Sequence, residues 1–104
     1  MPHRLAVASL AFLALGSGQA QPTATALQQR SLAATCAACH GTDGRAQADA
    51  GLIGLQGRDK GYLLAQLTAF RNGTRPATVM QQIAKGYTPE QLDQLATYFS
   101  TQAR

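Results

Sequence analysis

The stretch TCAACHG, residues 35 to 41, contains both cysteines of the 104-residue chain and one of its two histidines. Cys36 and Cys39 are three positions apart, and His40 follows directly. A disulfide between thiols this close in sequence would close only a small loop and would constrain the unfolded chain weakly. Stabilisation by a disulfide therefore does not explain the motif.

Three other chemistries use two thiols at this spacing. A thiol-disulfide oxidoreductase would place the pair beside a βαβ pattern, which the sequence lacks, and a zinc site would need two further ligands where only His40 is at hand. In the third, the two thiols add across the two vinyl groups of a haem, and the adjacent histidine reaches the iron from one face. The motif thus predicts one covalently bound haem c, attached through Cys36 and Cys39, with His40 as the proximal iron ligand.

The first twenty residues, MPHRLAVASLAFLALGSGQA, have the pattern of a secretory signal peptide: Arg4, an apolar run from Leu5 to Leu15, and small residues up to Ala20. An uncleaved anchor or a buried helix is the alternative. Eleven residues would rise only about 16 Å as a helix, against a bilayer core of about 30 Å, so a membrane span is not expected. We expect a signal peptide at residues 1–20, cleavage near Ala20 and a periplasmic protein.

Residues 21–104 are expected to form a single domain with one haem. A chain of 84 residues buries so little apolar surface that its fold is only marginally stable without further support, and a bound group would help to fill its core. Eight Lys and Arg against five Asp and Glu give these residues a formal charge of +3. The basic residues are scattered along the chain, so no nucleic-acid partner is expected.

The helical patterns predict a small all-α fold, because no segment shows convincing strand alternation. Thr88, Pro89 and Gln91 form the capping-box signature of a last helix, whose buried stripe is predicted to be Leu92, Leu95, Ala96 and Phe99. Asp59 is the expected cap of a helix running to Phe70, with its stop at residues 72–73. Further helices are predicted at residues 26–35 and 79–84, and six glycines between residues 41 and 61 predict a loop that wraps tightly around something.

Met80 is the expected sixth ligand of the iron. If residues 1–20 are removed, Met80 is the single methionine left and His40 the single histidine. A lone methionine is usually core filler, but a thioether can also bind haem iron and raise its reduction potential. A filled sixth position favours electron transfer. Without it, the protein would be a gas-binding or peroxidase-like haem protein, although residues 21–104 hold no second histidine for either chemistry.

The segments CAACHG (36–41), YLLAQLTAFRNGTRP (62–76) and VMQQIAKGYTPEQLDQLATYF (79–99) together resemble class I cytochromes c. Within that class the chain looks most like one half of the small periplasmic two-haem cytochromes, and especially like the cytochrome subunit of flavocytochrome c sulfide dehydrogenase. The resemblance implies a helical bundle wrapped around haem c, with Cys36 and Cys39 attaching the haem and His40 and Met80 as its axial ligands.

The same resemblance implies a role without bond-breaking chemistry of its own: a carrier that accepts electrons from a flavoprotein sulfide dehydrogenase and passes them on. A free-standing shuttle, or a subunit of another periplasmic dehydrogenase, is the alternative, because one fold serves many pairings. Relatives usually have a proline in the loop after the motif, near a carbonyl that holds the proximal imidazole. The matching position is expected to be Ala50, which puts that contact in doubt.

Three basic residues are candidates for a weak partner-docking rim around the exposed haem edge: Arg71, Arg75 and Lys85. The alternative is ordinary solvated charge, which is what soluble domains normally show.

Overall fold

The computed structural model describes residues 18, 20, 21, 23–49 and 51–104. The expected signal peptide and Ala50 therefore lie outside the described residues, apart from a few positions near the expected cleavage site. The elements follow in the order α1 (Ala24–Ala34), α2 (Ala37–His40), η1 (Thr42–Gly44), α3 (Lys60–Asn72), α4 (Met80–Lys85) and α5 (Pro89–Ser100). All the elements of the described part are helical, which confirms the predicted fold class.

The ends of the helices follow from local capping chemistry. Thr88 accepts a hydrogen bond from the amide of Gln91, and the Gln91 side chain accepts one from the amide of Thr88, so the predicted capping box is present. Asp59 caps α3 through the amide of Tyr62, and α3 stops where Gly73 takes a left-handed conformation. Thr23 caps α1 through Ala26, so this helix begins two residues before the predicted position.

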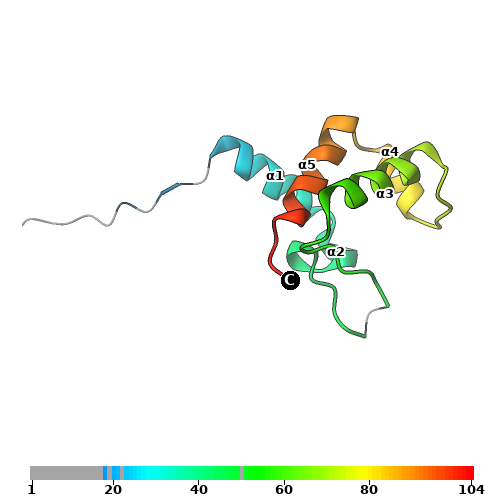
Figure 1. Cartoon of the computed structure of the whole chain (residues 1–104), viewed down its shortest axis with the longest axis horizontal. Coiled ribbons are helices and arrows are strands. Elements are labelled where there is room, and N and C mark those ends of the chain that lie inside the picture. The colour runs from blue at the N-terminus through cyan, green and yellow to red at the C-terminus, as the bar shows by residue number, and fades with distance from the viewer. Residues whose placement is uncertain (1–17, 19, 22, 50) are drawn as a thin grey trace, which may run out of the picture.

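The core lies where α1 and α3 pack against α5 (Figure 1). The predicted stripe of α5 is buried in full. In α3 only Leu63 is completely buried, and Leu64 and Leu67 pack against the edge of the core. The cluster is made of six buried residues, Ala33, Leu63, Leu92, Leu95, Ala96 and Phe99. A Leu95→Ala change here would cost about 2 to 5 kcal/mol of stability, because it leaves a cavity among packed neighbours.

The remaining elements surround this core. In Figure 1, α4 lies beside α3, and the C-terminus ends close to α2 and the loop that follows it. Among the described residues, no helix is both long enough and apolar enough to cross a membrane.

Candidate haem site

Cys36, Cys39 and His40 are brought together by one helical turn. The amide of Cys36 donates to the Ala33 carbonyl at 3.0 Å, which continues the chain from α1, and the amide of His40 donates to the Cys36 carbonyl at 2.9 Å. Both cysteines are free thiols, Cys36 half-buried and Cys39 exposed. The turn therefore presents two unpaired thiols and an imidazole within five residues.

The His40 imidazole is oriented by the backbone of the following loop. Its Nδ1 lies 2.8 Å from the carbonyl oxygen of Ile53. Because a carbonyl can only accept, Nδ1 must carry a proton, so the neutral imidazole has its free lone pair on Nε2. This is the protonation state that a metal-binding histidine needs, and such a second contact fixes the ring and raises its basicity.

The carbonyl that meets the His40 imidazole belongs to Ile53, three positions further along the chain than Ala50, where the sequence predicted the matching position. Ala50 itself lies outside the described residues.

The loop after His40 turns tightly at glycines. Gly41 and Gly44 have φ values of +81° and +78°, where a side chain would be strained. A Cβ on Gly41 would overlap the backbone of Arg45, and one on Gly44 would lie 2.9 Å from both Leu55 and Phe99. The Leu55 amide in turn donates to the Gly44 carbonyl at 2.8 Å. We name residues 35–49 with 51–57 the cysteine segment.

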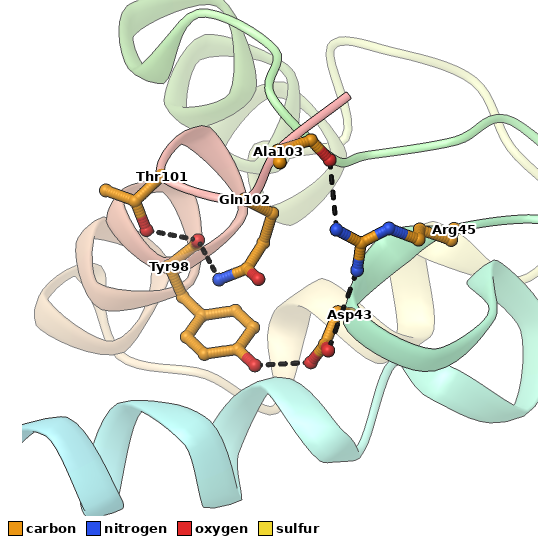
Figure 2. Close-up of polar contacts among 6 residues, drawn as sticks. All are labelled: Asp43, Arg45, Tyr98, Thr101, Gln102 and Ala103. Atoms are coloured by element: carbon orange, nitrogen blue, oxygen red, sulfur yellow. Dashed lines mark hydrogen bonds and ion pairs between the residues drawn. The ribbon is translucent and has the colours of Figure 1, made fainter. Parts of the chain in front are cut away.

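The C-terminal end of the chain is fastened to the cysteine segment by a small polar cluster (Figure 2). The Tyr98 hydroxyl donates to Asp43 at 2.5 Å, and Arg45 lies 3.7 Å from the same carboxylate and donates to the Ala103 carbonyl at 3.1 Å. The hydrogen bond to Asp43, together with burial and the negative charge of the carboxylate, raises the pKa of Tyr98. Backbone bonds add to the contact, since Gly57 donates to the Phe99 carbonyl at 2.8 Å.

Burial raises the pKa of the Cys36 thiol, and the contact of this thiol with the Thr35 side chain partly opposes the shift. Cys36 therefore stays a neutral thiol at neutral pH, unlike the low-pKa cysteines of thiol oxidoreductases. This agrees with the sequence, which lacks the βαβ pattern of a thiol-disulfide oxidoreductase.

Met80 is the first residue of α4 and is half-buried. It stands on a different element from the cysteines, and α4 packs chiefly against α3. We name residues 71–88 the Met80 segment. Side chains hold it at both ends: Gln81 Nε2 donates to the Arg75 carbonyl at 3.1 Å, and Arg71 Nε donates to the Tyr87 carbonyl at 2.9 Å.

The three candidates for a basic rim have different surroundings. Arg71 is engaged with Tyr87, and Arg75 donates to Gln66 at 2.5 Å with its guanidinium 4.6 Å from the centre of the Phe70 ring. Lys85 is exposed at the end of α4. The two arginines thus have structural contacts, and Lys85 is the better candidate for contact with a partner.

The described residues fit a bound haem in two respects. His40 offers a free Nε2 beside two unpaired thiols. Several large apolar side chains are also exposed in the segments that carry the predicted ligands: Leu52, Ile53, Val79 and Ile83. Val79 is 55% exposed and Ile53 50%, so both segments offer apolar surface to a bound group.

An open hollow of about 550 Å³ lies between α2 and the loop through Leu52. Cys39 lines it, but His40 and Met80 do not. We therefore do not identify this hollow with the space between the two predicted ligands.

Comparison with known proteins identifies the family. Residues 26–103 match the family described as cytochrome c, a range that includes all four predicted haem residues. The cytochrome subunit of sulfide dehydrogenase from Chlorobaculum tepidum is 41% identical over 68 residues, covering 65% of this chain and 60% of that protein. The thiosulfate dehydrogenase electron acceptor of Stutzerimonas stutzeri is 44% identical over 64 residues, covering 62% of this chain and 30% of that protein.

A shorter relative matches over most of its length. Cytochrome c-554(548) of Halomonas halodenitrificans is 38% identical over 71 residues, covering 65% of this chain and 84% of that protein. The chain thus spans less than two thirds of the length of the two sulfur-compound relatives.

Proposed function

Because this chain belongs to the cytochrome c family, which carries covalently bound haem c, we propose that it is a single-haem electron carrier of the periplasm. The His40 contact supports this most directly: Nδ1 is committed to Ile53, and Nε2 is left for iron. When bound, the haem supplies a one-electron couple at its iron.

Four residues have defined roles in this proposal. The thiols of Cys36 and Cys39 form the thioether bonds, His40 is the proximal ligand and Met80 the distal ligand. A sixth ligand from the protein leaves no open position for oxygen or peroxide, which favours electron transfer over gas binding and peroxidase chemistry. Export rests on the composition of residues 1–20, and the single haem domain is residues 21–104.

We propose a flavoprotein dehydrogenase of the sulfide-oxidising type as the electron donor. The similarity to a sulfide dehydrogenase cytochrome subunit supports this partner, and the similarity to a thiosulfate dehydrogenase electron acceptor supports a sulfur-compound dehydrogenase more generally. A downstream cytochrome or oxidase would receive the electron.

Replacing Met80 by alanine tests the ligand assignment. The variant holoprotein should take up carbon monoxide when reduced and cyanide when oxidised, and its reduction potential should fall, because the thioether favours the reduced iron. An unchanged potential without ligand uptake would show that Met80 is a core residue, and the gas-binding and peroxidase alternatives would then return.

Purification from the native periplasm at low salt tests the partner. Haem c bands with stoichiometric flavin, reduced on addition of sulfide, would support the dehydrogenase assignment. Haem c bands on a small monomer without flavin would contradict it and favour a free-standing shuttle.

A further inference from the structure

The hydroxyl groups of Thr35 and Tyr87 lie 2.6 Å apart, although 52 positions separate them in the sequence. Thr35 directly precedes Cys36, and Tyr87 follows two residues after α4, the helix that begins with Met80. This hydrogen bond therefore joins the cysteine segment to the Met80 segment, the two parts of the chain that carry the predicted axial ligands.

The direction of the bond can be deduced from its neighbours. The Thr35 hydroxyl donates its single proton to the Leu32 carbonyl at 2.7 Å. It can then only accept from Tyr87, so the Tyr87 hydroxyl is the donor. The contact consequently requires a hydroxyl at both positions, and neither phenylalanine at 87 nor valine at 35 can replace it.

The rest of Tyr87 is held firmly, so its hydroxyl can transmit a constraint. Its carbonyl accepts from Arg71 on α3, its amide donates to the Ala84 carbonyl at 3.2 Å, and its ring packs against the core cluster. By contrast, α4 has six residues and buries only Ala84 fully. A helix with so little buried surface depends on the contacts at its ends for its position.

We propose that the Tyr87 hydroxyl is a positioning group for Met80: by bonding Thr35, it holds α4 in place relative to the turn that carries Cys36 and His40. The proposal rests on the proposed function, in which Met80 binds iron. Loss of the bond would make the thioether a weaker competitor for the iron, because the ligand-bound arrangement would be a smaller share of the population.

The binding of cyanide to the oxidised holoprotein, in competition with Met80 for the iron, measures the strength of the Met80 bond directly. An external ligand binds only when Met80 is displaced, so its apparent affinity rises as the Met80 bond weakens. Tyr87→Phe should bind cyanide about 3- to 10-fold more tightly than the unaltered protein, the range expected for loss of one hydrogen bond.

Tyr98→Phe is the matched control. It also removes a tyrosine hydroxyl bonded to a side chain of another segment, but this bond joins α5 to the cysteine segment and does not involve the Met80 segment. It should lower the unfolding midpoint to a similar extent while leaving the cyanide affinity unchanged. Equal changes of affinity in the two variants would reduce the Tyr87 effect to general stability and would overturn the proposal, as would no change in Tyr87→Phe.

Variants at Thr35 test the same hydrogen bond from its other partner. They can be used even if Tyr87→Phe does not accumulate as a haem-containing protein. Thr35→Val should reproduce the tighter cyanide binding, Thr35→Ser should restore the original affinity, and combining Thr35→Val with Tyr87→Phe should add nothing further. Additive effects would overturn the pairing. Failure of the proposed function itself would be visible separately: Met80→Ala would then bind cyanide no more tightly than the unaltered protein.

Discussion

The cysteine segment and the Met80 segment are held in place by different means. In the cysteine segment, backbone atoms make most of the decisive contacts: the Ile53 carbonyl orients His40, Gly44 pairs with Leu55, and Gly57 pairs with Phe99. In the Met80 segment, the decisive contacts come from side chains, those of Gln81, Arg71 and Tyr87. We infer that the first segment is sensitive to glycine replacement, and the second to loss of single polar groups.

The largest expected effect comes from preventing haem attachment, which removes the cofactor that both segments are proposed to bind. With Cys36→Ser and Cys39→Ser, the chain should lose most of its helical circular dichroism, because the exposed apolar side chains of both segments would have nothing to cover them. The unaltered chain, matured with haem in parallel, is the control. A cooperative thermal transition in the haem-free variant would show that the core around α5 is sufficient.

The second effect compares two glycines with the same φ of +78°, Gly44 in the cysteine segment and Gly73 in the Met80 segment. Gly44→Ala should cost about 2 to 5 kcal/mol of stability, because backbone strain adds to the overlap with Leu55 and Phe99. Gly73→Ala meets no atom within 4 Å and should cost only the strain, about 1 to 2 kcal/mol. Chemical denaturation of the holoproteins measures both, and equal costs would contradict the proposed difference between the segments.

A third, smaller effect is expected at Tyr98, which fastens α5 to the cysteine segment. Tyr98→Phe should lower stability by about 1 kcal/mol at neutral pH, because one hydrogen bond is lost. Since the folded protein raises the pKa of Tyr98, this advantage should be complete below the ordinary tyrosine pKa of about 10 and should shrink as the pH rises beyond it.

Chemical denaturation of Tyr98→Phe and of the unaltered protein, from neutral pH to above the tyrosine pKa, measures this difference in stability. A difference that stays constant to high pH would mean that Tyr98 stabilises the fold by packing instead of by its bond to Asp43.

The smallest effect on the fold is expected at Lys85, an exposed residue of the Met80 segment. Lys85→Glu should leave stability nearly unchanged but slow reduction by the natural donor about 2- to 5-fold at low salt, as expected for one charge near a docking surface. The difference should fade with added salt, because the screening length drops from about 10 Å at 0.1 M to about 3 Å at 1 M. Stopped-flow reduction measures it.

Arg30→Glu makes the same change of charge on α1, where Arg30 is exposed, and is the control. Equal slowing in the two variants would mean that net charge matters and that the Met80 side is not the docking surface. Arg75 is unsuitable for this test, because its contacts with Gln66 and Phe70 would be lost at the same time.

Much of the fold could be predicted from local sequence rules. The capping box at Thr88, the cap at Asp59 and the stop at Gly73 were all readable, because each depends on residues within one helical turn. The stripe of α5 was readable for the same reason, and its burial confirms it. In α3, by contrast, only Leu63 is fully buried, and Leu64 and Leu67 lie at the edge of the core.

The predicted site also has a part that could be read from local sequence and a part that could not. In the structure Cys36, Cys39 and His40 lie on one helical turn, as their short spacing allows. Their roles and that of Met80 as haem residues stay predictions, as do the division at residue 20 and the export of the chain. The contacts that support the site were not foreseen: no sequence signal pointed to the Ile53 carbonyl, the bond of Tyr98 to Asp43 or the bond of Tyr87 to Thr35.

The sequence by itself determined the family, the helices and the residues able to bind a haem, because these depend on residue type and on short spacings along the chain. The tertiary structure alone decided which carbonyl orients His40, which arginines are occupied and which hydroxyl ties the Met80 segment to the cysteine segment. The physical reason is that the contacts of His40 with Ile53, Arg71 with Tyr87 and Tyr87 with Thr35 join positions 13, 16 and 52 residues apart. Their partners are selected by how α1, α3 and α5 pack, and no local pattern contains that information.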